Sequence, residues 1–284
     1  MIDVSDQPVP RSLIVTFYGA YGRFAPGPVP VAELIRLLGA VGVDAPSVRS
    51  SVSRLKRRGL LLPARTAQGA AGYALSPDAR QLLDDGDLRV YATAPPGDEG
   101  WVLAVFSVPE SERHKRHLLR SRLAGLGFGT AAPGVWIAPA RLYEETRHTL
   151  HRLCLDPYVD FFRGEHLGFA ATAEAATRWW DLAAIAAQHE EFLDRQGPVL
   201  RAWETRADTP PEEAYHDYLL ALDSWRHLPY ADPGLPADLL PSDWPGVRSA
   251  AVFRALHERL RDAGAVFVEG EPGRTPAPET AAEP

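Results

Sequence analysis

The chain has 284 residues, of which 45% are hydrophobic, and this composition is that of a globular protein with two or three domains. It contains no apolar run of about 18 residues and no charged-then-apolar leader, so we expect a cytoplasmic protein with neither a membrane span nor a secretory signal. Cys154 is the single cysteine, which excludes an intrachain disulfide framework and a cysteine-based zinc site.

The net charge of −7 is distributed unevenly along the chain. Residues 1–90 carry 11 Lys and Arg against 8 Asp and Glu, a net charge of +3, so the remainder carries −10. A basic first third attached to an acidic body is the arrangement expected of one DNA-binding domain joined to other domains.

The first ten residues are short and polar, and we expect them to be flexible. Residues 11–90 are predicted to form one domain that begins with a helix over SLIVTFYGAYG, capped by Ser12 and ended by Gly22. A second helix covers VAELIRLLGAVG, ended by Gly42, and a third covers residues 47–58. Two helices, a short turn and a cationic third helix are the order of a helix-turn-helix.

The third helix has two different faces. Val48, Val52 and Leu55 recur at i, i+4 and i+7 and form an apolar stripe, while no acid occurs between Asp44 and Asp78. The basic face could bind DNA, or it could be a solvated face whose charges before a glycine stop complement the helix dipole. The residues of this helix that we assign to DNA binding are Arg49, Ser50, Ser53, Arg54, Lys56 and Arg57.

Two short extended runs after this helix flank a glycine-containing turn, which predicts a β-hairpin. A hairpin directly behind a recognition helix is the wing of a winged helix-turn-helix. Arg65 and Gln68 lie near its tip, where a wing would reach the DNA backbone or the minor groove. PDARQLLDDG then predicts a short helix with proline at its first position.

The linker ATAPPGDEG leads to a second predicted domain over residues 100–171. Its order is strand, helix, strand, helix and strand, with one further strand near residues 128–131, which is the order of a ferredoxin-like α/β unit. The expected strands are WVLAVFSVP, GVWIAP and VDFFRGEHLGF, and the expected helices are SERHKRHLLRSRLAGLGF and ARLYEETRHTLHRLC.

Residues 172–269 are predicted to form a helical domain, with helices over 177–204, 211–228 and 247–264. Its many aromatic residues recur at helical spacing, which is more typical of a core than of a pocket for an aryl group. Residues 270–284 are rich in proline, alanine and glutamate, so we expect a disordered tail.

Several of these segments resemble the PaaX-like regulators, the family of phenylacetic-acid-degradation repressors. The resemblance covers residues 11–268 in the same order, and it is carried by VRSSVSRLKRRGLL, WVLAVFSVPES, LGFGTAAPGVWIAP and, most specifically, DPGLPADLLPSDWPG. It implies an α+β multidomain protein with an N-terminal winged helix-turn-helix, a central ferredoxin-like domain similar to a CRISPR-associated endoribonuclease fold, and a helical C-terminal domain.

The resemblance also implies a function. Such proteins are homodimeric repressors that bind double-stranded operator DNA of aromatic-acid catabolic genes and leave it when an aryl-acetyl-CoA such as phenylacetyl-CoA binds. This chain departs from the family in its wing, because Arg65 is the one basic residue there and the family's wing often carries more. The sequence does not locate the effector site.

The central fold leaves a nucleic-acid-processing enzyme as an alternative. Nucleases of the similar fold hold a metal with an acidic residue at the end of the first strand, where this chain has Ser107 and Val108. A hydroxyl does not replace a carboxylate as a ligand of a hard metal, so we predict no catalytic residue. A third possibility is a ligand-binding protein whose basic helix only assists packing.

Three further groups of side chains could have a functional role or only a structural one. The pairs His114/His117 and His148/His151 could hold a metal, but the HExxH pattern is missing, so we predict no metal site. Cys154 has no marked partner base and is expected to be an ordinary thiol. A second basic cluster could be a solvated helix face, or it could attract the phosphates of an acyl-CoA or of DNA; its members are Arg113, Lys115, Arg116, Arg120 and Arg122.

Overall fold

The computed structural model describes residues 9–92 and 100–270, which form two compact units. The first combines the residues up to Arg80 with Val199–Asp223 and the residues from Ala255 onward, and the second combines Gln81–Pro198 with Ser224–Arg254. The predictions for most of the N-terminal segment, the linker and the tail lie outside the described residues. The three predicted linear domains therefore remain predictions.

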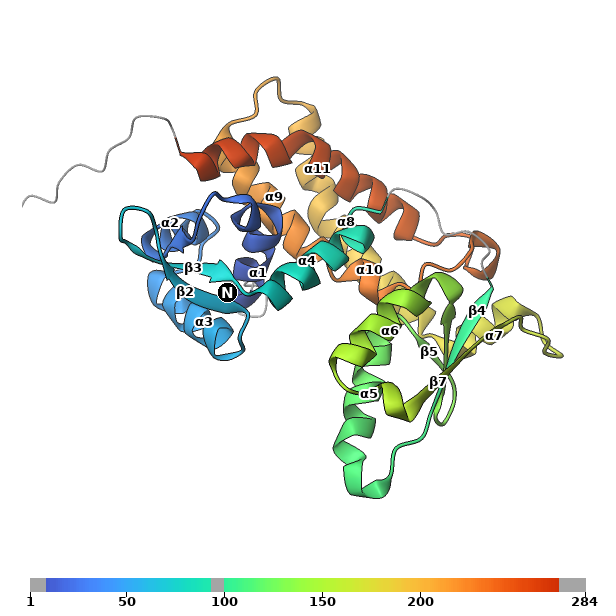
Figure 1. Ribbon diagram of the computed structural model, residues 1–284. Coiled ribbons are helices and arrows are strands. Elements are labelled where there is room, and N and C mark those ends of the chain that lie inside the picture. Colours follow the sequence, from blue (N-terminus) through green and yellow to red (C-terminus); the bar gives the residue numbers. More distant parts are fainter. Residues whose placement is uncertain (1–8, 93–99, 271–284) are drawn as a thin grey trace, which may run out of the picture. The chain divides into compact units, whose positions relative to one another are not determined.

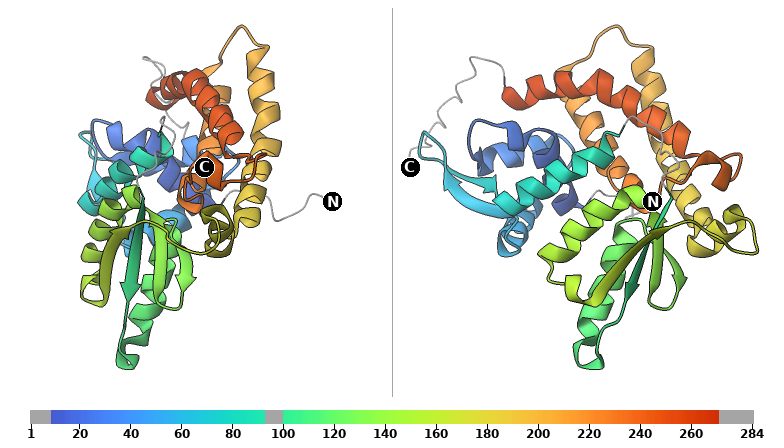
Figure 2. Two further views of the ribbon diagram at one scale, coloured as in Figure 1. Left: turned by 90° about the vertical axis from the view of Figure 1, so that its right-hand side faces the viewer. Right: turned by 45° about the vertical axis from the view of Figure 1, so that its right-hand side comes forward.

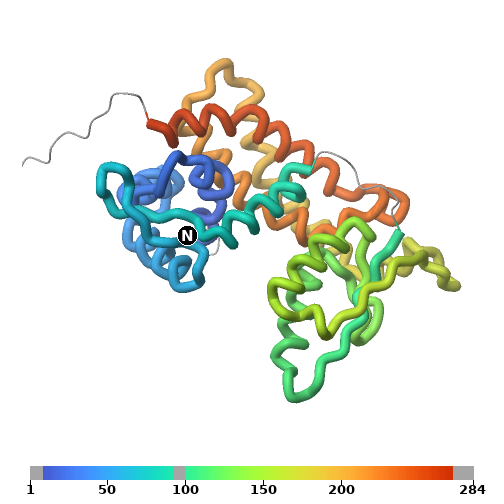
Figure 3. Tube along the Cα trace, viewed as in Figure 1, coloured from blue at the N-terminus to red at the C-terminus, as the bar shows by residue number. Residues whose placement is uncertain are grey.

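The first unit begins with helices and a small sheet in the order of a winged helix-turn-helix (Figure 1). The helices are α1 (Pro10–Ala20), α2 (Val31–Gly39) and α3 (Ala45–Arg57). An antiparallel sheet with strand order β1-β3-β2 is formed by β1 (Val29–Pro30), β2 (Leu61–Arg65) and β3 (Ala71–Leu75), so the predicted hairpin is present. Figure 3 traces the chain from α3 directly into this hairpin.

The predicted capping of the first helix by Ser12 is wrong. The helix begins at Pro10, whose ring presets a helical φ at this end, and its N-cap residue, Val9, makes no side-chain capping bond. The Ser12 hydroxyl instead donates to Oδ1 of Asp223 at 2.7 Å, and Thr16 donates to the same oxygen at 2.6 Å. The Ser12 hydroxyl, which the sequence pattern assigned to the helix cap, is thus bonded to Asp223, more than 200 positions away in the sequence.

Other helix ends also differ from the prediction. The second helix ends at Gly39 rather than Gly42, because a turn follows in which Gly42 N–H donates to the Gly39 carbonyl. The helix after the wing, α4 (Pro77–Val90), starts at the predicted proline but continues past the predicted Gly86. The carbonyl of Val90, its last residue, accepts a hydrogen bond from Nε1 of Trp225. The end of the helix is thus held by a tertiary contact.

The second unit contains a four-stranded antiparallel sheet with the order β5-β6-β4-β7, which is the ferredoxin-like topology predicted for the central region. The strands are β4 (Trp101–Phe106), β5 (Gly129–Ala132), β6 (Val135–Pro139) and β7 (Val159–Gly164), and the helices between them are α5 (Arg113–Gly125) and α6 (Tyr143–Arg152). Figure 2 shows these two helices on one side of the sheet.

The two faces of this sheet are buried by different partners because side chains alternate along β4. Val102 and Ala104 point into a core with Leu119, Leu123 and Leu150 of the two helices. Trp101 lies in a second core that is completed by residues after β7, namely Ala176, Trp180, Leu182, Ile185 and Leu235.

The C-terminal region is helical as predicted, with one interruption. Its helices are α7 (Thr172–Trp179), α8 (Leu182–Glu204), α9 (Pro211–Trp225), α10 (Leu228–Ala231) and α11 (Gly246–Glu269). The helix predicted to continue through residue 180 breaks there, because Trp180 is extended and its indole donates to the Gly127 carbonyl at 2.9 Å. Asp181 then caps α8 by accepting from Ala184 N–H.

Most of the aromatic residues of this region pack in the core rather than around a pocket. The aromatic residues that are at most 7% exposed are Trp180, Phe192, Trp203, Tyr215, Tyr218, Trp225 and Phe253. Trp225 stacks on Phe253 with ring centroids 4.9 Å apart. No helix among the described residues is long and apolar enough to cross a membrane.

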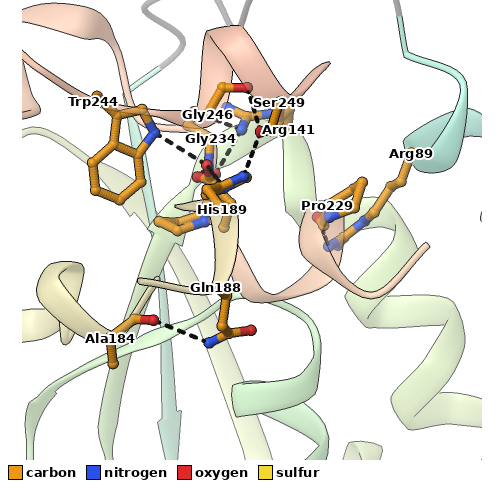
Figure 4. Close-up of polar contacts among 12 residues, drawn as sticks. Arg89, Arg141, Ala184, Gln188, His189, Pro229, Gly234, Trp244, Gly246 and Ser249 are labelled. Atoms are coloured by element: carbon orange, nitrogen blue, oxygen red, sulfur yellow. Dashed lines mark hydrogen bonds and ion pairs between the residues drawn. The ribbon is translucent and has the colours of Figure 1, made fainter. Parts of the chain in front are cut away.

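The loop before α11 is held by one carboxylate, that of Asp232. Its Oδ2 lies 3.0 Å from Nε2 of His189 and 3.3 Å from the indole nitrogen of Trp244, and its Oδ1 accepts from Gly234 N–H at 2.7 Å. On its other ring nitrogen, His189 contacts the Ser249 hydroxyl at 2.7 Å (Figure 4). The cluster thereby joins the loop to α8 and to α11.

The guanidinium of Arg141 fixes the same loop from the sheet side. Its Nη2 donates to the carbonyls of Pro233 and Gly234, each at 2.7 Å. Both polar anchors satisfy backbone or side-chain groups that would otherwise be buried without partners.

Replacing Asp232 with alanine should strongly destabilise the second unit. The change leaves His189, the Trp244 indole and the Gly234 amide without their acceptor, and we expect the free energy of unfolding to fall by about 2–5 kcal/mol. Urea denaturation followed by tryptophan fluorescence measures this. Asp238→Ala, in the same loop but exposed, is the matched control and should change the midpoint little; equal midpoints for the two variants would contradict the assignment.

Candidate nucleic-acid interface

The start of α3 is fixed by Asp44. Its carboxylate accepts from the Ser47 amide at 2.8 Å and from the Ser47 hydroxyl at 2.7 Å, so it caps the first turn. These hydrogen bonds stabilise the charged form and lower the pKa of Asp44 below its usual value, the Ser47 amide contributing most. The helix begins two residues earlier than predicted.

The end of α3 is closed by a glycine in the left-handed conformation. Gly59 has φ of 72°, its amide donates to the Lys56 carbonyl, and the Leu60 amide donates to the Leu55 carbonyl, both at 3.0 Å. This is the Schellman arrangement, and Arg58 is the C-cap residue. Both helix ends are therefore held by local hydrogen bonds, independently of any partner.

Between these ends, the two faces of α3 are separated as the periodicity predicts. Val48, Val52 and Leu55 are at most 3% exposed and pack in the core of the unit. The predicted DNA-binding side chains are all exposed on the opposite arc: Arg49, Ser50, Ser53, Arg54, Lys56 and Arg57. Within residues 9–92 and 100–270, no carboxylate pairs with any of these four cations.

The wing residues lie at the tip of the β2–β3 hairpin. Arg65 and Gln68 are exposed, and Nη1 of Arg65 donates to the Gly69 carbonyl at 2.8 Å. The tip is closed by mutual hydrogen bonds between Thr66 and Ala70. Arg65 thus helps to shape the turn while part of its guanidinium remains available at the surface.

The end of β4, where nucleases of the similar fold place an acidic metal ligand, has no carboxylate. Ser107 is exposed there and its amide donates to the Tyr158 carbonyl at 3.0 Å. In the described parts of the chain, no group of three His, Cys, Asp or Glu residues lies together in a way that could hold a metal. The two histidine pairs are exposed on α5 and α6, and Cys154 is exposed with φ of 53°.

Sequence reasoning missed the Ser249–His189–Asp232 relay, which has the connection order of a hydrolytic triad. Its burial excludes that use, because Ser249 is 0% and His189 2% exposed, and the Ser249 hydroxyl can donate to the Gly246 carbonyl. Figure 4 shows His189 and Ser249 in the network of polar contacts around this loop. The loop sequence DPGLPADLLPSDWPG carried the family resemblance, but no sequence pattern indicated that Asp232 of this loop would contact His189.

The second unit also contains a cavity of about 590 Å³ that the sequence did not locate. Its wall mixes apolar groups with both signs of charge, and the main contributors are Trp101, Arg163, His166, Thr172, Asp238 and Leu239. The volume lies within the range of small-molecule sites in proteins.

Comparison with known proteins gives three consecutive family matches. Residues 9–79 match the PaaX-like protein, residues 94–176 the PaaX protein central Cas2-like domain, and residues 180–270 the PaaX-like protein C-terminal domain. The chain belongs to the PaaX-like family.

Two relatives of this PaaX-like protein support the assignment at different levels. The transcriptional repressor PaaX of Escherichia coli (strain K12) is 27% identical over 279 residues, which are 94% of this chain and 86% of that protein. The solved structure of the uncharacterized protein Rv0674 from Mycobacterium tuberculosis has a TM-score of 0.55 and 24% identity, covering 90% of this chain and 98% of that one. The second likeness shows the fold alone.

The cap of α3 makes a testable contribution to pH-dependent stability of this PaaX-like protein. Because the folded-state pKa of Asp44 is lowered, its stabilising effect is present above the unfolded-state pKa of about 3.9 and is lost as the pH falls through the folded value. We expect Asp44→Ala to lower the Tm at pH 7, with the difference from the native chain shrinking toward pH 3. Asp44→Ser, which keeps a capping oxygen without titrating, should retain most of the pH 7 stability; a pH-independent loss in Asp44→Ala would contradict the explanation.

Proposed function

We propose that this protein is a transcriptional repressor that binds double-stranded operator DNA through the exposed arc of α3. The observation that carries the proposal is that arc, in which four cations without carboxylate partners among the described residues lie on a helix fixed at both ends. The family match over the winged helix-turn-helix and the likeness to a transcriptional repressor along 94% of the chain support it.

The proposed readout follows from the chemistry of the side chains. Arg49 and Arg54 are long enough to reach guanine O6 and N7 in the major groove, where a bidentate contact discriminates between bases by about 1–3 kcal/mol. Ser50, Ser53, Lys56 and Arg57 are suited to phosphate contacts, which position the helix without reading sequence. Arg65 and Gln68 would extend the contact to the backbone or minor groove beside the wing.

The alternative of a merely solvated basic face accounts for part of α3 only. Lys56, Arg57 and Arg58 stand at the C-terminal end, where cations complement the helix dipole. Arg49 lies outside the last turn and gains nothing from the dipole there. Its exposure beside Ser50 and Ser53 therefore favours a binding surface.

A nucleic-acid-processing enzyme is the second candidate, and the absence of a carboxylate at the end of β4 within the described chain disfavours it. The relative named above is a transcriptional repressor. Metal-dependent cleavage of DNA or RNA by the purified protein would favour the enzyme instead.

We further propose that the repressor is a cytoplasmic homodimer released from DNA by an acyl-CoA, of which phenylacetyl-CoA is the first to test. A twofold dimer reads two half-sites, so one effector can control both. Release requires the effector to bind the DNA-incompetent state more tightly than the DNA-bound one. The regulated genes and the operator sequence would come from selecting bound duplexes out of fragmented genomic DNA.

The cavity beside Trp101 is our candidate for the acyl and pantetheine parts of this effector. Its wall includes Leu239 and Asp238, which belong to the loop that Asp232 anchors to α8 and α11. Arg163 and His166 add donors suited to carbonyl or phosphate oxygens. A ligand here would press on a loop that is tied to two long helices.

Substitution of Arg54 by alanine should weaken operator binding while leaving the fold intact. Losing one bidentate contact of about 1–3 kcal/mol corresponds to a roughly 5- to 150-fold higher Kd, measured by fluorescence anisotropy on the selected operator at fixed salt. Arg58→Ala, at the C-cap of the same helix, is the control and should change Kd much less. Unchanged operator affinity in Arg54→Ala would refute the assignment of this residue.

Filling the cavity should remove the effector response without affecting DNA binding. A Cβ added at Gly164, which lines the cavity, would meet no atom within 4 Å, so we expect Gly164→Phe to fold and to occupy the space. We expect operator release by phenylacetyl-CoA to need at least about tenfold more ligand. Gly125→Phe, at another open position, is the control; a normal response in Gly164→Phe places the effector elsewhere.

A further inference from the structure

Helix α5 has a basic face that the recognition helix does not account for. Leu119 and Leu123 are fully buried against the sheet. Arg113, His117 and Arg120 recur at i, i+4 and i+7, and all three are exposed on another side of the helix. Figure 1 shows α5 running beside the sheet, and the segment 113–122 contains no acid.

The position of the first-turn cations of α5 is electrostatically unfavourable. The first turn of α5 contains no acidic residue and begins with Arg113, His114, Lys115 and Arg116. Cations at this end oppose the positive pole of the helix dipole, whereas Arg54, Lys56 and Arg57 of α3 lie in the last turn, at the favourable end. Dipole complementation, which explains part of α3, therefore cannot explain the first-turn cations of α5.

Nearby carboxylates pair with two of the first-turn cations of α5. Glu112 pairs with Lys115 at 2.7 Å, and Glu110 pairs with Arg116 at 3.2 Å. In the part of the chain that the structure describes, neither Arg113 nor Arg120 has a carboxylate partner.

Elsewhere in the same unit, exposed arginines are commonly paired. The pairs are Arg147 with Glu144, Arg152 with Asp85, Arg195 with Glu191 and Arg248 with Glu190. Pairing is thus readily available in a chain whose acids outnumber its bases by 37 to 30. The unpaired arginines of α5 depart from that pattern.

The surface formed by these residues is an open hollow of about 330 Å³. It is lined by Glu110, Arg113, His114, Arg116, His117 and Arg120. From Arg113 to Arg120 the helix rises about 10 Å. One strand of duplex DNA presents a phosphate about every 3.4 Å along its axis, so this row can face about three successive phosphates, whereas a single small anion would use only part of it.

We propose that this face of α5 is a second phosphate-binding surface, which binds the backbone of a nucleic acid without reading its sequence. The guanidiniums of Arg113 and Arg120 pair with phosphate oxygens, and His114 and His117 add ring donors between them. The first-turn amides of the helix provide the positive pole for the same anions. The inference rests on the proposed function only for the identity of the partner as DNA.

The test uses the full chain and a random-sequence duplex, so that no operator is needed. Kd is measured by anisotropy across a series of salt concentrations for the native chain and for Arg113→Gln/Arg120→Gln. Each neutralised phosphate adds about 0.9 to the slope of log Kd against log salt, so the double variant should lower that slope by about 1.8. The control, Arg122→Gln/Arg147→Gln, removes the same charge from other exposed positions of the unit and should lower it far less.

Each outcome separates this inference from the proposed function. Equal slopes for the two double variants, or no binding of the random duplex by the native chain at low salt, overturn the α5 surface. The inference is also overturned if Arg113→Gln/Arg120→Gln keeps its slope but no longer responds to phenylacetyl-CoA, because the face then belongs to an effector site. Loss of operator preference in Arg49→Gln/Arg54→Gln, tested in parallel, addresses α3 alone. Equal thermal melting of all variants confirms that they fold.

Discussion

The outward direction of the basic arc on α3 is set by burial of its opposite face. Val48, Val52 and Leu55 are almost completely removed from solvent, and burying such side chains contributes about 1.5–3 kcal/mol each. An exposed charge near a helix end contributes typically 0.3–1 kcal/mol, so electrostatics cannot rotate the helix about its axis. The candidate interface therefore depends on apolar packing, which holds the arginines in solvent whether or not DNA is present.

The comparison of α3 with α5 shows that charge composition alone does not separate a binding face from a solvated one. Both helices carry basic clusters, but α3 has three cations in its last turn, whereas α5 has Arg113, Lys115 and Arg116 in its first turn. The helix dipole stabilises cations at the C-terminal end of a helix and destabilises them at the N-terminal end. The position of each cation along its helix, and the carboxylates around it, determine how far the protein itself accounts for the cation.

Local patterns predicted the parts of this fold that depend on local interactions. The periodicity of Val48, Val52 and Leu55, and the strand order of the central domain, agree with the structure. Two of the failures involve distant partners: Ser12 bonds to Asp223 instead of capping a helix, and the predicted helix breaks at Trp180, whose indole reaches Gly127. Such contacts are decided by tertiary packing, which single-sequence periodicity does not contain.

The Asp232 cluster contains the residue types of a catalytic triad but has a structural role. Ser249, His189 and Asp232 are connected as in a hydrolase, yet no substrate reaches a serine that is fully buried. What the relay does instead is hold a loop whose other side chains, including Leu239, form a wall of the cavity beside Trp101. Because that loop is fixed through buried hydrogen bonds at one end and through Arg141 beside it, the wall is preformed. A preformed wall reduces the entropic cost of ordering the loop when a ligand binds. More of the interaction energy can then appear as a difference in ligand affinity between two states of the protein.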